Sequence, residues 1–350
     1  MRMKIMATSL LQTLGLGLLG PAACLATLLL GASSTSAGAA GGADAALAPP
    51  LTIIVPFTPG GDSDLSARAL APFAQKYLHA SSVQVLNKPG AAGQGGVPST
   101  KAFLEATPDG NTVLMGRGGN IAVAPALMVH APYTPEDFTI LAVLQIDPLV
   151  CAVRADSPYQ KPRDVVDDIR ARPGAVRYST AGIGSVQNLS VLYFVKISGL
   201  KPDGVKAVHL ASSGDATRAL LDGEVELSCG SVLLMVPHIK SGRLRGLFGT
   251  SPTGRLAQLP AMPSAQEVGL RDMSKMVGWS VLVAPPKMPA PALARWRTAL
   301  QKIADDPQWV NGIEQSGGLV AIKSLPRPAE FVNDQFNLYE ELGINLGLRK

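Results

Sequence analysis

The chain has 350 residues, of which 47% are hydrophobic and 16% are charged. This length suggests one large or two ordinary domains, and the hydrophobic content suffices for a packed core, which excludes a disordered acidic chain and a long solvated coiled coil. The formal net charge of +5 is not concentrated in a block of lysine and arginine, so we expect no nucleic-acid partner.

The N-terminal segment has the order of a secretory signal peptide. Arg2 and Lys4 precede an apolar stretch, which a tract of small residues follows. This order predicts export, with cleavage that removes approximately residues 1–39. An uncleaved membrane anchor is the alternative, because the stretch is long enough to span a bilayer, but its glycines and proline favour cleavage. Cys24 matches a lipidation site only in part, since Pro21 stands where an aliphatic residue is required.

After this segment, short apolar runs alternate with amphipathic segments. The apolar runs predict strands at 51–55, 83–86, 112–115, 149–153, 176–178, 205–210, 226–229, 244–249 and 280–284. Helical spacing predicts a helix that begins after residues 62–64 and another that ends at residue 221 after a cap at 211–215. It also predicts helices at 98–106, 162–171, 186–197, 233–241, 290–304 and 327–342. Repeated strand–turn–helix units predict an α/β fold with mostly parallel sheets. In such sheets a ligand binds outside the carboxyl ends of the strands.

Three of the predicted turns between a strand and a helix combine small residues with hydroxyl groups. They are residues 58–64, 180–188 and 212–217. A helix start leaves backbone N–H groups unpaired and carries a partial positive charge, and glycines let a ligand approach the backbone. Such turns suit a carboxylate or a phosphate. Each turn alone is explained as well by helix capping through Asp62, Asp64, Ser185 or Ser213, but three in one exported chain favour a binding site.

Other motifs argue against catalysis. Gly182-x-Gly184-x-x-Asn188 is an incomplete dinucleotide-binding motif, and no nucleophile elbow, phosphate-loop lysine or metal-ligand spacing of the histidines is present. We therefore expect no cofactor, no metal and no enzymatic activity. Cys151 and Cys229 lie in apolar, strand-like contexts. Two buried thiols are the simpler interpretation, and a disulfide is the alternative, because pairing cannot be deduced from sequence.

Residues 55–64, Val-Pro-Phe-Thr-Pro-Gly-Gly-Asp-Ser-Asp, resemble the V-P-F-x-P-G-G-x-x-D signature of the periplasmic solute receptors of tripartite tricarboxylate transporters, the Bug family. Further similar motifs follow at 87–93, 108–110, 125–127, 178–185, 220–225, 237–240, 242–245, Trp279 and 283–286. The resemblance covers about residues 50–345. It implies a two-domain periplasmic binding protein of type II (Venus-flytrap) architecture, with a mostly parallel sheet flanked by helices in each domain. Domain 1 would comprise residues 48–146 plus 250–350, and domain 2 residues 147–249.

The resemblance also implies a ligand in the interdomain cleft, with one carboxylate held by two opposing loops. Carried onto this chain, the ligand-binding residues are Phe57, Thr58, Gly60, Gly61, Asp62, Ser63 and Asp64 of the first loop, Arg117, then Thr180, Ala181, Gly184, Ser185 and Asn188 of the second loop, and Ser212, Ser213 and Asp215 at the distal end.

Several of these positions depart from the family pattern. Asp62 stands where a small residue is usual, Asn188 replaces a common histidine, and Arg117 takes a position that is usually small or hydroxylated. We hypothesise that Asp62 or Asp215 pairs with an amine of the ligand, because a buried acid without a cation is costly. The alternatives are that Asp62 caps a helix and faces solvent, or that Arg117 neutralises an acid locally.

The implied function is binding of a small carboxylated solute in the periplasm by hinge closure. The solute would be a di- or tricarboxylate, an amino acid or an aromatic acid, delivered to membrane transporter subunits. An orphan receptor or a sensor co-receptor that signals to a membrane protein is the alternative. An enzyme on the same scaffold would need a nucleophile and a base in the cleft, and the sequence offers neither. We expect a monomer.

Overall fold

The computed structural model describes residues 49–90 and 94–349. The predicted signal peptide, its cleavage site and Cys24 lie outside these residues. None of the helices that the structure describes combines the length and the hydrophobicity needed to cross a bilayer.

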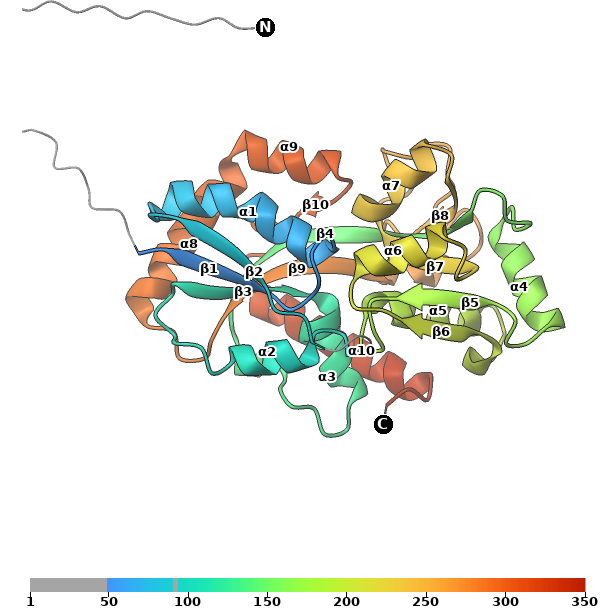
Figure 1. The fold of residues 1–350 in the computed structure, drawn as a ribbon, viewed down its shortest axis with the longest axis horizontal. Coiled ribbons are helices and arrows are strands. Elements are labelled where there is room, and N and C mark those ends of the chain that lie inside the picture. The colour runs from blue at the N-terminus through green and yellow to red at the C-terminus, as the bar shows by residue number, and fades with distance from the viewer. Residues whose placement is uncertain (1–48, 91–93, 350) are drawn as a thin grey trace, which may run out of the picture. The chain divides into compact units, whose positions relative to one another are not determined.

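Strands and helices alternate along the chain (Figure 1). The strands are β1 (Leu51–Val55), β2 (Val83–Asn87), β3 (Thr112–Arg117), β4 (Thr139–Arg154), β5 (Arg177–Thr180), β6 (Lys206–His209), β7 (Leu227–Ser231), β8 (Leu244–Gly249), β9 (Val277–Ala284) and β10 (Leu319–Val320). The α-helices are α1 (Asp62–Leu78), α2 (Val97–Phe103), α3 (Ala124–Leu127), α4 (Pro162–Ala171), α5 (Val186–Ile197), α6 (Ser213–Leu221), α7 (Val232–Lys240), α8 (Ala290–Asp305), α9 (Pro307–Gln315) and α10 (Pro328–Asn345).

The long strand β4 belongs to two groups of strands. Its first part, Thr139–Pro148, runs antiparallel to β9, and β9 in turn pairs with β3 of the parallel set β2-β1-β3. Its second part, from Leu149 onward, runs antiparallel to β7 and β8, and β7 continues into the parallel set β7-β5-β6. We call the first group with its helices the first lobe and the second group with its helices the second lobe. In Figure 1, β4 runs from one to the other.

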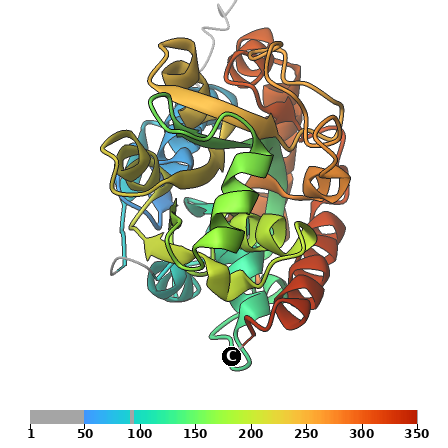
Figure 2. The same ribbon diagram turned by 90° about the vertical axis from the view of Figure 1, so that its right-hand side faces the viewer.

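Each lobe buries an apolar face of its strands under helices. In the first lobe, α1, α8 and α9 pack over β1 and β3, with Leu70, Trp296 and Trp309 fully or almost fully buried. In the second lobe, β4, α7 and β8 share a core with residues 256–262, which follow β8. The helix α4 lies at the outer end of this lobe, nearest the viewer in Figure 2.

The structure confirms the predicted α/β fold and shows which strands are parallel and which are antiparallel. The parallel pairing that the sequence predicts holds for the outer strands of each lobe, whereas the strands around β4 and β9 are antiparallel, so the sheet is mixed. The strand predicted at 149–153 is the end of β4, which begins ten residues earlier. Arg117 ends β3 and does not follow it. The sequence analysis did not predict α3 or β10, which are very short. It also missed α9, although Asp306 caps this helix and Pro307 occupies its first position.

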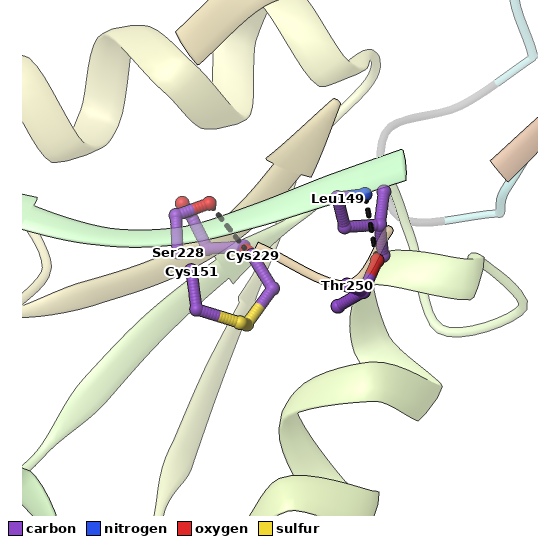
Figure 3. Close-up of a disulfide and its surroundings, with 6 residues drawn as sticks. Leu149, Cys151, Ser228, Cys229 and Thr250 are labelled. Atoms are coloured by element: carbon purple, nitrogen blue, oxygen red, sulfur yellow. Dashed lines mark hydrogen bonds between the residues drawn. A yellow bond between two sulfur atoms is a disulfide. The ribbon is translucent and has the colours of Figure 1, made fainter. Parts of the chain in front are cut away.

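Cys151 and Cys229 form a disulfide, the alternative that the sequence left open. They face each other directly across β4 and β7, and both are fully buried. Figure 3 shows the bond close to the point where the chain crosses between the lobes, marked by the hydrogen bond from Leu149 N–H to Thr250 Oγ1 at 2.8 Å.

Replacing both cysteines by alanine should lower the free energy of unfolding by about 2–4 kcal/mol. The disulfide closes a loop between residues 78 positions apart, so it restricts the unfolded chain. Urea unfolding of the Cys151→Ala/Cys229→Ala variant measures the loss. The control is the wild type unfolded in the presence of reductant, because it loses the disulfide but keeps the sulfur atoms. Equal midpoints for oxidised and reduced wild type would show that the bond contributes nothing to stability.

Candidate functional site

A cavity of about 60 Å³ lies between the two lobes. This space has room for a few waters, because one water needs about 10–15 Å³. Its first-lobe lining is Phe57, Gly61, Asp62, Ser63, Gly95, Arg117, Gly118, Gly119 and Gly278; its second-lobe lining is Leu149, Ala181, Gly184, Ser185, Val186, Gln187, Ser212 and Ser213. Most of these residues follow the carboxyl ends of strands, where the topology of an α/β sheet places a ligand.

The start of α1 forms one wall of the cavity. Gly60 has a positive φ of 81°, and its N–H donates to Asp64 Oδ2 at 2.9 Å, which fixes the turn. Arg68 Nε donates to the same oxygen at 3.0 Å. Burial would raise the pKa of Asp64, but these hydrogen bonds outweigh it and hold the pKa below its usual value. Asp64 is therefore turned into the loop, whereas Ser63, anchored through its Oγ to Met115 O at 3.0 Å, faces the cavity.

The start of α5 forms the opposite wall. Ser185 caps the helix by accepting from Asn188 N–H at 3.1 Å, as the sequence predicted for a capping serine. The Asn188 side chain accepts from the Tyr178 hydroxyl at 2.7 Å and donates to Ile183 O at 2.8 Å, so it braces the loop from behind. Thr180 is likewise turned inward, with Oγ1 2.8 Å from His209 Nδ1.

Both walls of the cavity carry backbone N–H groups without a partner. Within residues 49–90 and 94–349, the N–H groups of Ser63, Gly184 and Gln187 have no acceptor, and all three residues line the cavity. Two helix N-termini, each with unpaired N–H groups and a partial positive charge, thus meet across a small space. This arrangement suits a carboxylate.

A buried ion cluster forms the floor of the cavity. Arg117, whose side chain is 13% exposed, donates through Nη1 to Asp147 Oδ2 at 2.6 Å and to Ser280 Oγ at 2.5 Å. Asp62 Oδ2 lies 3.9 Å from Arg117 Nη2. Burial opposes the Arg117 cation, but the charges of Asp147 and Asp62 outweigh it and raise the pKa of Arg117. Burial also raises the pKa of Asp147, and Arg117 opposes that rise. Arg117 thus neutralises Asp147, an acid that the sequence analysis did not single out, and lies farther from Asp62.

The third predicted turn closes the lobes against each other. Ser212 caps α6 by accepting from Asp215 N–H at 3.1 Å. Asp215 accepts from Ser212 Oγ at 2.8 Å and from Thr58 Oγ1 of the first lobe at 2.9 Å. Asp62 N–H donates to Ser213 Oγ at 3.0 Å, again across the lobes. These bonds fix the present closed arrangement.

Glycines allow this close approach. A Cβ on Gly214 would lie 2.7 Å from Gly60 O, and a Cβ on Gly119 would lie 3.2 Å from Gly184 O. At Gly184, a Cβ would lie 2.7 Å from the Cα of Ala124 in α3. Real Cβ atoms essentially never make contacts under 3.0 Å, so the closed arrangement requires glycine at positions 214 and 184, whereas at Gly119 the neighbouring backbone would have to shift slightly.

The sixteen residues carried over from the resemblance separate into two groups. Those that line the cavity are Phe57, Gly61, Asp62, Ser63, Arg117, Ala181, Gly184, Ser185, Ser212 and Ser213. Those that the structure places in the surrounding loops are Thr58, Gly60, Asp64, Thr180, Asn188 and Asp215.

Sequence reasoning missed several residues of the site. Asp147 and Gln145 lie on β4, and Gln145 Nε2 donates to Asp147 Oδ1 at 2.5 Å. Ser231, at the end of β7, donates to Asp62 Oδ1. Gln187 lines the cavity and accepts through Oε1 from Ala181 N–H at 2.8 Å. Asp147 could have been found from the sequence, because a polar residue within a buried strand requires a polar partner.

The chain is similar in sequence to a known protein family. Residues 66–348 match the family model described as tripartite tricarboxylate transporter family receptor. BugT of Bordetella pertussis is 31% identical over 245 residues, which cover 69% of this chain and 72% of BugT. A UPF0065 protein of the same organism is 28% identical over 324 residues, 91% of this chain and 95% of that protein.

Two solved structures extend the similarity to the fold. MatC from Rhodopseudomonas palustris, solved with bound malate, aligns with a TM-score of 0.77 and 26% identity, over 84% of this chain and 99% of MatC. The periplasmic binding protein BugD aligns with a TM-score of 0.77 and 25% identity, over 86% of this chain and 99% of BugD. The chain belongs to the tripartite tricarboxylate transporter receptor family. This family and this fold are those of solute-binding receptors and not of enzymes.

Proposed function

We propose that the protein binds a small carboxylate-bearing solute in the cavity between its lobes, in the periplasm, and delivers it to a membrane transporter of the tripartite tricarboxylate type. The observation that carries this proposal is the meeting of two helix N-termini, with the unpaired N–H groups of Ser63, Gly184 and Gln187 among the described residues. MatC, a relative in fold and sequence, was solved with the dicarboxylate malate.

We also propose that binding closes a hinge between the first lobe and the second lobe, whose core includes residues 256–262. The chain crosses to the second lobe after Pro148 of β4 and returns at Val277 of β9, because residues 256–262 still pack in the second-lobe core. Pro148 and Val277 pair with each other, so the two crossings lie side by side. Paired crossings of this kind let two lobes rotate with little change elsewhere. A ligand held by both walls binds the closed state more tightly and so shifts the population toward it.

A thermal-shift screen of the purified protein tests the binding step. The panel contains di- and tricarboxylates, amino acids, and the aromatic acids nicotinate and terephthalate. A ligand at about 100 times its dissociation constant stabilises the folded state by about 2.7 kcal/mol, which gives a clear rise in melting temperature. The matched alcohol or amide of each hit should give no shift. A folded protein that no carboxylate stabilises would contradict the proposal.

Delivery is tested separately in the native host. Deleting the gene should abolish uptake of the radiolabelled hit, and a plasmid copy should restore it. Unchanged uptake, with binding retained by the purified protein, would contradict delivery and leave binding intact.

A further inference from the structure

The carboxylate of Asp62 lies at the cavity, and among the described residues only one of its two oxygens accepts a hydrogen bond. Asp62 is the first residue of α1 and is only 6% exposed, so it does not face bulk solvent. Its Oδ1 accepts from the Ser231 hydroxyl of the second lobe. In the part of the chain that the structure describes, its Oδ2 accepts no hydrogen bond, and the nearest cationic atom, Arg117 Nη2, is 3.9 Å away.

The charges around this oxygen do not balance. Arg117 is the one cationic side chain among the described residues that line the cavity, and its Nη1 is engaged by Asp147 and Ser280. One guanidinium therefore faces two buried carboxylates. A buried carboxylate without its own cation is costly, because burial removes its hydration. A ligand that brings a second negative group next to this cluster would add repulsion in a site of low dielectric.

We infer that Asp62 binds a cationic nitrogen of the ligand, so that the solute is a small zwitterion with a carboxylate and an ammonium group. This inference rests on the proposed function, which supplies the carboxylate anchor at the starts of α1 and α5. The ammonium group would donate to Asp62 Oδ2 and restore the charge balance of the cluster. Charge-assisted hydrogen bonds of this kind are stronger than the bond that a neutral hydroxyl would donate. Asp215, the other acid considered from the sequence, is engaged by Thr58, Ser212 and Arg218 outside the cavity lining.

Pairs of ligands that differ only in an amine or a hydroxyl test the inference by isothermal titration calorimetry at neutral pH. The pairs are L-aspartate with L-malate and L-alanine with L-lactate. In each pair whose members bind, we expect the wild type to bind the amino acid at least about tenfold more tightly than the hydroxy acid. Asp62→Asn should lose this preference by weakening the amine selectively. The control Asp167→Asn, which makes the same change at an exposed residue of α4, should keep it.

The outcomes separate this inference from the proposed function. Equal or tighter binding of the hydroxy acids by the wild type overturns the ammonium site and leaves carboxylate binding intact. A preference for amines that survives in Asp62→Asn also overturns the role of Asp62. Binding of no member of either pair, and of no carboxylate in the thermal-shift screen, overturns both proposals. The wild-type comparison needs no variant, so it remains decisive even if Asp62→Asn does not fold.

Discussion

Replacing Arg117 by methionine is expected to lower the free energy of unfolding by about 3–5 kcal/mol. The change keeps the length of the side chain but leaves Asp147, which is 1% exposed, without the cation at 2.6 Å. It also removes the only positive charge near Asp62 among the described cavity residues. The cost is that of an uncompensated buried charge and exceeds the contribution of any exposed pair.

Urea unfolding of Arg117→Met and of the control Arg163→Met measures this effect. Arg163 is 69% exposed at its side chain and pairs with Asp167 along α4, so its loss should change stability by less than about 1 kcal/mol. Equal effects of the two changes would show that the cluster in the cavity floor does not stabilise the fold.

The loss in Arg117→Met should depend on pH. Burial already raises the pKa of Asp147, and the Arg117 charge opposes that rise. Without Arg117 the pKa of Asp147 in the folded state rises further above its value in the unfolded state. The cost of folding with an ionised Asp147 is therefore complete above the raised pKa, and it declines as the pH falls from there toward the unfolded pKa. The deficit relative to wild type should therefore be smaller at about pH 5 than at about pH 8. A deficit that grows on acidification would contradict this assignment.

The second large effect is expected on ligand binding. Gly184→Ala should weaken the binding of a hit from the thermal-shift screen by about 10- to 100-fold, because overpacking of this kind costs about 1–3 kcal/mol. The new methyl group would lie 2.7 Å from the Cα of Ala124, a backbone atom of the opposite lobe that cannot give way easily. Since the clash exists only when the lobes meet, the melting temperature without ligand should stay close to that of the wild type.

Gly312→Ala is the matched control, because a Cβ on Gly312, within α9, would meet no atom within 4 Å. Its affinity should equal that of the wild type. Unchanged affinity in Gly184→Ala would show that binding does not require the lobes to approach as they do in this structure.

Local sequence patterns predicted the starts of the helices that line the site. The small and hydroxylated residues at 58–64, 180–188 and 212–217 do lie at the starts of α1, α5 and α6. Of the four capping candidates, Ser185 caps its helix, whereas Asp62, Asp64 and Ser213 lie inside theirs, and Ser212 caps α6. These features depend on a few neighbouring residues, so a single sequence reveals them.

Contacts between distant residues could not be predicted in this way. The Arg117–Asp147 pair depends on the sheet order β3-β9-β4, which no local pattern specifies. The bond between Asp215 and Thr58 joins residues 157 positions apart, and it turns Asp215 away from the cavity. The disulfide depends on the register of β4 with β7. In each case tertiary packing selects among partners that the sequence allows equally.

A crystal structure of the protein with a bound hit from the screen tests the central proposal most directly. We predict a ligand carboxylate within hydrogen-bonding distance of the N–H groups of Ser63 and Gln187, between lobes closed as in this structure. A ligand bound elsewhere on the protein, or a carboxylate that contacts only one lobe, would contradict binding by closure.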